Sequence, residues 1–238
     1  MEQHPITIVT GAGSGIGRAI AIKLGSNGHR LALVSRTASS LNATREVILA
    51  SNPDTQVEVI PADIGMPDTA QEIVSNVIDR WQRLDVLVNA AGMAPSLQVD
   101  EHDFDLIRRT IDVNAVGPAA LVIEAWPHWI AQGAGCLVNI SSLSSIDPFP
   151  GFLAYGMSKS AMDGLVRSVH NEGSEHGIRA FTLTLGAVET KMLRSFIDEE
   201  TLPTSATLDP DEVASRVMDC IDGQRDQECG TQIQVVRN

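Results

Sequence analysis

The sequence predicts an α/β fold in which a parallel sheet of about seven strands is covered by helices on both faces. Short runs rich in β-branched and aliphatic residues alternate with longer segments of helical spacing, the order expected of βαβ units. The short runs are apolar almost throughout, as in strands that are buried on both faces. The expected strands are Ile6–Val9, Leu31–Val34, Val57–Ile60, Val86–Val88, Cys136–Ile140, Ala180–Leu185 and Ile233–Val236.

Helical spacing is clear in three of the segments between these strands, where apolar residues fall four positions apart and so share one helix face. They are Ile16, Ile20 and Leu24, then Ile73, Val77 and Trp81, and finally Val213, Val217 and Ile221. No linker-like tract, repeat or long charge block divides the chain, so we expect one domain over residues 1–238. The segment 191–210 departs from this rhythm, and we expect it to be a lid or a mobile substrate loop.

Composition argues against several classes of partner. Of the 238 residues 43% are hydrophobic, and the net charge of −13 would repel a nucleic acid. The longest apolar run, Ala119–Ile123, is far shorter than the roughly 20 residues of a membrane helix. The first residues lack the basic and apolar regions of a targeting peptide, so we expect none, and Cys136, Cys220 and Cys229 fit neither a disulfide framework nor a zinc site. We therefore expect a cytoplasmic protein with reduced thiols, no metal, no nucleic-acid partner and no membrane span.

A glycine-rich turn follows the first expected strand and opens the first helix. In Thr10–Gly17 the glycines Gly11, Gly15 and Gly17 have the spacing G-x-x-x-G-x-G. Glycines at such a turn let the backbone approach a pyrophosphate, and the helix N-terminus supplies free N–H groups. The pattern therefore favours a doubly wound Rossmann domain that binds a dinucleotide over an ordinary turn.

The second expected strand indicates which dinucleotide is bound. Sites for NAD commonly have an acidic residue there that bonds the ribose 2′-hydroxyl, but no acidic residue occurs between Glu2 and Glu46. Arg36 follows the strand instead, between the hydroxyls of Ser35 and Thr37. A guanidinium beside two hydroxyls suits a 2′-phosphate, so we predict NADP(H); the alternative is that Arg36 is a solvated surface side chain.

A phenol and an amine are spaced for joint chemistry. Tyr155, the only tyrosine, lies four residues before Lys159, so on a helix the two side chains share a face. A nearby ammonium should lower the pKa of the phenol, which suits a proton donor and acceptor for a carbonyl/alcohol pair. Because a tyrosine and a lysine at this spacing also occur by chance, the surrounding motifs decide whether the pair is catalytic.

With that context, the sequence resembles the short-chain dehydrogenase/reductase family from Thr7 to Val236, and most closely its 3-oxoacyl-carrier-protein reductases and related carbonyl reductases. The resemblance rests on an ordered set of motifs. They are Thr10–Gly17, Asp63-Ile64, Asn89-Ala90-Ala91-Gly92, Asn114 in a long helix, Asn139-Ile140-Ser141-Ser142 and Tyr155–Lys159.

The resemblance implies four catalytic roles. Tyr155 would be the general acid of reduction and the general base of oxidation. Lys159 would bind the nicotinamide ribose and lower the pKa of Tyr155, and Asn114 would hold a water that links Lys159 to solvent. Among Ser141, Ser142, Ser144 and Ser145, the family spacing of 13 residues before the tyrosine selects Ser142 as the donor to the substrate oxygen.

The resemblance also implies cofactor contacts, beside those of Tyr155 and Lys159. These residues are Gly11, Ser14, Gly15, Ile16 and Gly17 at the phosphates, Asp63 and Ile64 at the adenine, Asn89, Ala90, Ala91 and Gly92 at the ribose, and Val188 and Thr190 at the carboxamide. Leu185 stands where the family usually has proline, which would leave the loop of Val188 and Thr190 less constrained.

The predicted function is hydride transfer between NADP(H) and a small carbonyl or alcohol substrate, of 3-oxoacyl or another type. Two alternatives remain open: an NADP(H)-binding sensor without turnover, and an NAD-dependent alcohol dehydrogenase. Substrate choice should come from Met93–Leu97, Leu143–Phe152 and Lys191–Pro210. The resemblance further implies a homodimer or homotetramer built on the long helices, in which Trp126 and Trp129 serve packing or an interface.

Overall fold

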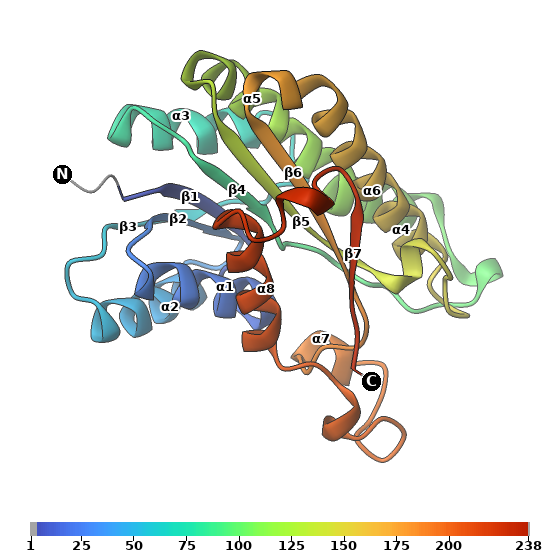
Figure 1. Cartoon of the computed structure of the whole chain (residues 1–238). Coiled ribbons are helices and arrows are strands. Elements are labelled where there is room, and N and C mark those ends of the chain that lie inside the picture. The colour runs from blue at the N-terminus through green and yellow to red at the C-terminus, as the bar shows by residue number, and fades with distance from the viewer. Residues whose placement is uncertain (1–3, 238) are drawn as a thin grey trace.

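A computed structural model describes residues 4–237 and contains one parallel sheet of seven strands in the order β3-β2-β1-β4-β5-β6-β7 (Figure 1). The strands are β1 (Ile6–Thr10), β2 (Arg30–Ser35), β3 (Val57–Pro61), β4 (Val86–Asn89), β5 (Gly135–Ser142), β6 (Ile178–Leu185) and β7 (Gln232–Val235). Each strand expected from the sequence is present, which confirms the predicted doubly wound α/β fold.

Helices cover both faces of the sheet. Figure 1 shows α1, α2 and α8 on one face and α3, α5 and α6 on the other. The helices are α1 (Gly15–Ser26), α2 (Ala38–Ser51), α3 (Thr69–Trp81), α4 (Phe104–Ile111), α5 (Gly117–Gln132), α6 (Leu153–Gly173), α7 (Lys191–Arg194) and α8 (Pro210–Ile221). The three helices predicted from apolar spacing are α1, α3 and α8.

Each face of the sheet has its own apolar core. On one face, Ile20 and Leu24 of α1 pack with Val213 of α8 around the inward side chains of the strands. On the other, Trp129 of α5 is fully buried, and its indole N–H donates to the carbonyl oxygen of Leu84 at 3.1 Å. Trp129 therefore serves packing, one of the two roles expected for it.

The predicted long helix that holds Asn114 is interrupted at that residue. Residues Asp112–Val116 form a π-helical turn between α4 and α5, and the N–H of Gly117 donates to the carbonyl oxygen of Asp112. Pro118 has no N–H and cannot donate to the carbonyl of Asn114 four residues before it, so the regular α-helical pattern cannot continue there. The wide turn points to a specialised position in the helix.

The strand order changes direction between β1 and β4, which are neighbours in the sheet. The connections that leave the carboxyl ends of these strands run to opposite faces and open a crevice at that edge. The glycine-rich turn after β1 and the Asn89–Gly92 segment after β4 meet at this crevice, and their residues begin the candidate site.

Candidate active site and dinucleotide cleft

A cleft lies at the carboxyl ends of the first strands of the sheet. Nine of the predicted cofactor residues line it: Gly11, Ser14, Ser35, Arg36, Thr37, Asp63, Ile64, Ala91 and Gly92. Gly13, Ser40, Ala62, Met93, Arg109 and Val113 also line it and were not predicted as cofactor contacts. The other predicted contacts, Gly15, Ile16, Gly17, Asn89, Ala90, Val188 and Thr190, with Tyr155 and Lys159, lie outside its lining.

The glycine-rich turn needs its glycines for close approach. Gly11 has φ +69°, and a Cβ on it would lie 2.8 Å from the backbone nitrogen of Ala91. A Cβ on Gly17 would collide with the carbonyl oxygen of Gly11. Since the N–H groups of Ala90 and Ala91 both donate to Thr10 Oγ1 at 3.1 Å, the turn is fastened to the end of β4. The result is a rigid, backbone-lined cradle of the kind that binds phosphates.

The end of β2 presents unpaired polar groups to the cleft. Arg36 is exposed and has no ion-pair partner among residues 4–237. The Ser35 hydroxyl oxygen is buried and without a hydrogen-bond partner in the described chain. A Cβ on Gly13 would lie 2.9 Å from that oxygen. The end of β2 therefore lines the cleft with a cation that has no ion-pair partner and a hydroxyl that has no hydrogen-bond partner, and only glycine fits at position 13 against Ser35 and Ser40.

Asp63 is fixed by a residue that the sequence did not reveal. Its carboxylate forms an ion pair with Arg109 of α4 and accepts the N–H of Gly65 at 3.1 Å. Arg109 lies 46 residues away in the chain, and only the fold brings it to this edge. The pair holds the Asp63–Ile64 segment against α4 at the far side of the cleft.

The proposed catalytic serine and tyrosine face one another. Ser142 ends β5, and Tyr155 lies in the first turns of α6. Burial raises the pKa of Tyr155 above its ordinary value of 10, and a hydrogen bond with Ser142 opposes that rise. Ser142 was selected among four serines by spacing, and the structure brings it to the phenol.

The expectation that Lys159 lowers the pKa of Tyr155 is wrong for this structure. The Lys159 nitrogen lies 5.6 Å from the centre of the Tyr155 ring and donates to the carbonyl oxygen of Ile140 at 2.7 Å. Burial lowers the pKa of Lys159 to about 8, although Asp163 acts to raise it. The Lys159 amine is therefore itself desolvated. The pKa of Tyr155 is set mainly by burial of its phenol.

Asn114 ties the crevice together through its side chain. Its carboxamide oxygen accepts the N–H of Met93 at 2.8 Å, and its nitrogen donates to the carbonyl of Met93 at 2.8 Å. The same nitrogen donates to Ser158 Oγ at 2.9 Å, and that hydroxyl donates to the carbonyl of Tyr155. The side chain thus links the segment after β4 to α6, and the water-holding role stays a prediction.

Asn89 bonds within the sheet, because its side chain donates to Asn139 Oδ1 at 2.9 Å. Val188 and Thr190 lie on the loop after β6. The Val188 side chain is buried, and the Thr190 methyl lies 3.3 Å from where a Cβ on Gly15 would be, closer than an ordinary van der Waals contact. The Thr190 hydroxyl caps α7 by accepting the N–H of Leu193.

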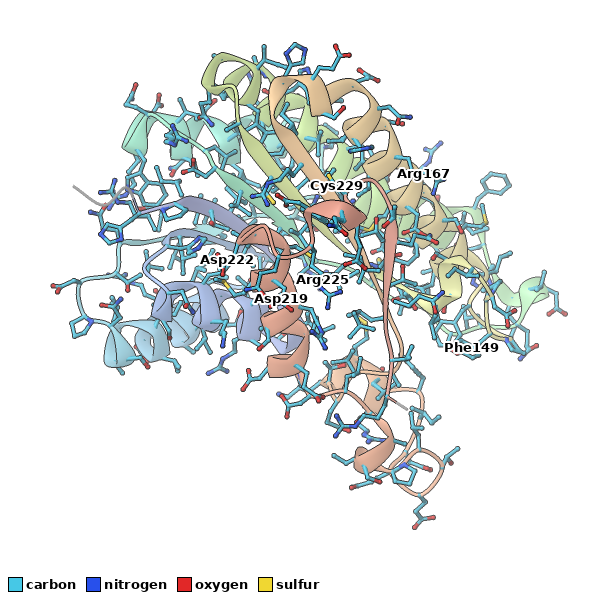
Figure 2. All side chains as sticks on the ribbon, in the orientation of Figure 1. Phe149, Arg167, Asp219, Asp222, Arg225 and Cys229 are labelled. Atoms are coloured by element: carbon cyan, nitrogen blue, oxygen red, sulfur yellow. The ribbon has the colours of Figure 1, made fainter. Side chains whose placement is uncertain are left out.

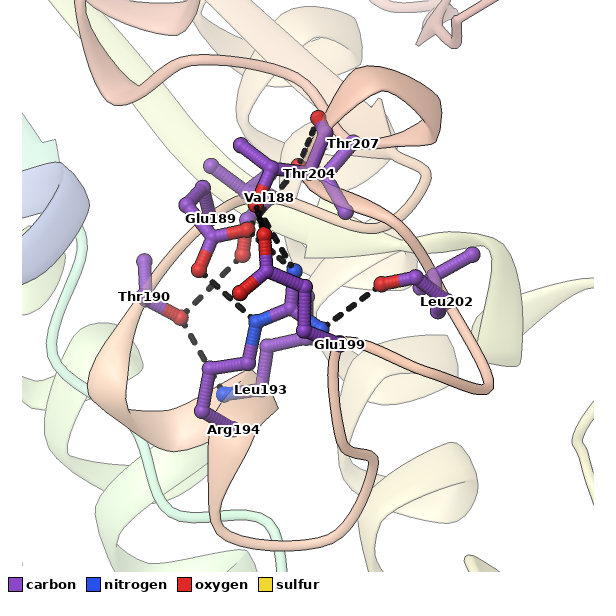
Figure 3. Close-up of polar contacts among 9 residues, drawn as sticks. All are labelled: Val188, Glu189, Thr190, Leu193, Arg194, Glu199, Leu202, Thr204 and Thr207. Carbon is purple, nitrogen blue, oxygen red and sulfur yellow. Dashed lines mark hydrogen bonds and ion pairs between the residues drawn. The ribbon is translucent and has the colours of Figure 1, made fainter.

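The loop after β6 is well anchored despite the missing proline. Gly186 N–H donates to the carbonyl of Val235 at 2.9 Å, and Val188 forms an isolated bridge with Leu208. Figure 3 shows that Glu189 and Arg194 pair within the following turn, with Nε to Oε1 at 2.8 Å. Main-chain and side-chain bonds therefore replace the constraint that Leu185 does not supply.

Two further features bear on the class of protein. No helix within residues 4–237 has the length and apolar character needed to cross a bilayer. In the same part of the chain no group of three or more histidine, cysteine or acidic side chains could hold a metal ion. The fold and the site together define the class of α/β proteins that bind a dinucleotide at the switch point of a parallel sheet.

The chain belongs to the short-chain dehydrogenase family, whose model matches residues 5–201, and it is an oxidoreductase of that family, which binds nicotinamide cofactors. An uncharacterised oxidoreductase of Staphylococcus epidermidis is 30% identical over 190 residues, covering 80% of each chain. Two solved structures share the fold: YwfH, an NADPH-dependent reductase involved in bacilysin biosynthesis (TM-score 0.91, 21% identity, 98% of this chain and 97% of that one), and NAD+-bound xylitol dehydrogenase (TM-score 0.90, 19% identity, 100% of both).

Proposed function

We propose that the protein is an NADPH-dependent reductase of ketones or aldehydes. The observation that carries the proposal is the meeting of Ser142, Tyr155 and Lys159 beside a cleft whose rim presents an unpaired Arg36. The first three supply hydrogen-bond donors and a proton at one point, and Arg36 supplies the charge that a 2′-phosphate needs.

The cleft supports NADPH over NADH for two reasons. Arg36 and Ser35 are the groups at the end of β2, and neither has a partner within the described chain. An acidic residue at the end of β2 would accept hydrogen bonds from the two ribose hydroxyls of NADH, but the sequence has no acidic residue there. Related folds use either cofactor, so this choice depends on the residues of this chain alone.

The proposed chemistry divides between cofactor and protein. Bound NADPH would supply the hydride to the carbonyl carbon. Ser142 and Tyr155 would donate hydrogen bonds to the carbonyl oxygen, and Tyr155 would deliver the proton as the alkoxide forms. A phenol whose pKa is raised remains protonated at neutral pH, which is the state that a proton donor needs. Lys159 would bind the ribose, and Asn114 would hold its water.

Substitution of Tyr155 tests the proposal. We expect Tyr155→Phe to bind NADPH as the parent protein does and to lose turnover at least about a hundredfold, since loss of one such donor typically costs that much. Ser142→Ala should lose activity to a similar degree. Ser145→Ala should not, because Ser145 is not assigned as a hydrogen-bond donor to the substrate oxygen. An active Tyr155→Phe protein would refute the proposed chemistry, and NADPH binding with no turnover of any carbonyl by the parent would favour a sensor.

We further propose a homo-oligomer built on α5. Val116, Ile123 and Ile130 lie seven residues apart from the π-turn to the end of this helix, and 53%, 68% and 36% of their surfaces are exposed. Such a stripe of apolar side chains is typical of a helix that packs on a second copy. Light scattering should find a dimer or tetramer that Ile123→Asp dissociates, and a monomeric parent would contradict the proposal.

A further inference from the structure

An aromatic row joins the proposed catalytic tyrosine to the segment 191–210. The ring of Phe152 meets Tyr155 edge to face, with centroids 5.9 Å apart and an interplanar angle of 63°. On its other side Phe152 meets Phe196 in the same manner, with centroids 5.1 Å apart and an angle of 75°. Because Phe196 comes from the segment 191–210, this segment reaches the surroundings of the phenol through Phe152.

Other large apolar side chains on these two segments are left open to solvent. Phe196 is 38% exposed and Met192 of α7 is 42% exposed. Phe149 on the loop before α6, which is labelled in Figure 2, is 58% exposed. Large exposed apolar groups near a reacting side chain commonly mark the part of a site that covers an apolar ligand. Phe152 and Phe196 form an aromatic wall beside Tyr155, which offers apolar surface instead of hydrogen-bond partners.

The segment that carries Phe196 is held in place by a polar network. The Arg194 guanidinium pairs with Glu189 and donates to the carbonyl of Leu202 at 2.8 Å, and Thr207 donates to Glu189 at 3.1 Å (Figure 3). Phe196 follows two residues after Arg194, so the network fixes the backbone that presents it. It also occupies Arg194, which is therefore not free to bind an anionic substrate.

The charges on these segments are predominantly negative. Asp198, Glu199 and Glu200 are consecutive in the segment 191–210, and all three are exposed. Asp147 is exposed on the loop before α6, and Lys191 is the cation of the segment 191–210 that has no ion pair in residues 4–237. With a net charge of −13 for the whole chain, this rim repels polyanions and acidic proteins.

We infer that the substrate is a free, uncharged ketone or aldehyde with a bulky apolar substituent, which packs on Phe152 and Phe196, and that carrier-bound acyl groups are excluded. The inference rests on the proposed reductase function and adds to it the chemical class of the substrate. Phe196 is then a specificity-determining residue, and the acidic run Asp198–Glu200 selects against substrates that an acidic carrier protein delivers.

The test compares three carbonyls with NADPH and the full-length protein. They are acetophenone as the apolar probe, dihydroxyacetone as the small polar probe, and an acetoacetyl thioester on an acidic acyl-carrier protein. We expect kcat/KM to be about a hundredfold higher for acetophenone than for dihydroxyacetone, because only the first buries a ring on the wall. The carrier-bound substrate should be poor at low salt and improve with added salt, while the acetophenone rate should not respond.

Matched variants then test the role of Phe196. Phe196→Ala should lower kcat/KM for acetophenone about tenfold and leave dihydroxyacetone unchanged, and Phe196→Leu should restore part of the loss. Phe104→Ala, which removes a ring that is 87% exposed on α4, should alter neither substrate.

The outcomes separate this inference from the proposed function. Reduction of the carrier-bound or polar substrate in preference to acetophenone would overturn the inference and leave the reductase function intact. An equal loss for both free carbonyls in Phe196→Ala would also overturn it, since the wall would then not discriminate. Absence of NADPH oxidation with all three carbonyls would overturn both.

Discussion

Replacement of Arg36 is the sharpest perturbation of the proposed cofactor site. A charge-assisted hydrogen bond typically contributes about 1.5–3 kcal/mol, and the exposure of Arg36 favours the lower end, because water screens the charge. About 1.5 kcal/mol corresponds to roughly a tenfold rise in the Kd of NADPH for Arg36→Ala. Arg36→Asp adds repulsion of a phosphate with a charge of about −2, worth roughly another 1–2 kcal/mol at about 4 Å in water. The expected loss is then about a hundredfold.

The assay is a fluorescence titration with NADPH and with NADH, at low and at high salt. NADH affinity should stay unchanged in Arg36→Ala, and the NADPH effect should shrink as salt screens the charge. Arg45→Asp is the matched control, since Arg45 is exposed on α2 but does not line the cleft. An unchanged ratio of NADPH to NADH affinity in Arg36→Asp would refute the reasoning.

Three pH-dependent properties follow from buried groups. The only tyrosine should titrate above pH 10 in the cofactor-free protein, because burial raises the pKa of Tyr155; a tyrosinate absorbance midpoint below 10 would contradict this. Burial lowers the pKa of Lys159 to about 8, so activity that needs the ammonium should fall as the pH rises through about 8, and a flat kcat/KM profile from pH 7 to 9 would show that the charge is not needed. Burial also lowers the pKa of His29 from 6.5 to about 4, so the unfolded state takes up its proton first and stability should fall as the pH drops from about 6.5 to 4. The free energy of unfolding, measured by denaturant titration, should fall by about 3 kcal/mol over this range. His29→Gln should lack this pH dependence, and an identical pH dependence in parent and variant would exclude the role of His29.

The fold was predictable because its determinants are local and repeated. Strands such as Leu31–Val34 are short, apolar and bounded by polar residues, so their character can be recognised without tertiary information. The ends of the strands were harder to predict, since β5 extends to Ser142 and includes polar residues at its carboxyl end. The π-turn at Asn114 was missed although Pro118, four residues later, is the signal that could have revealed it.

The site was predictable where a motif fixes the residue and unpredictable where the fold assembles it. Ser35, Arg36 and Thr37 are adjacent in the chain, and all three line the cleft. Arg109 and Ser40 line the same cleft, but they sit on helices whose faces cannot be oriented toward a ligand from spacing alone. The pKa of Tyr155 was predicted in the wrong direction because burial of the phenol, which spacing does not reveal, raises that pKa and outweighs the hydrogen bond with Ser142.

Transfer of deuterium from NADPH labelled at C4 of the nicotinamide tests the account most directly. With a panel of ketones and aldehydes, mass spectrometry should find a product alcohol with one deuterium on the carbinol carbon, formed by the parent protein and lost in Tyr155→Phe. A protein that binds NADPH and forms no labelled alcohol from any carbonyl, or a Tyr155→Phe variant that still forms it at the parent's rate, would contradict the assignment.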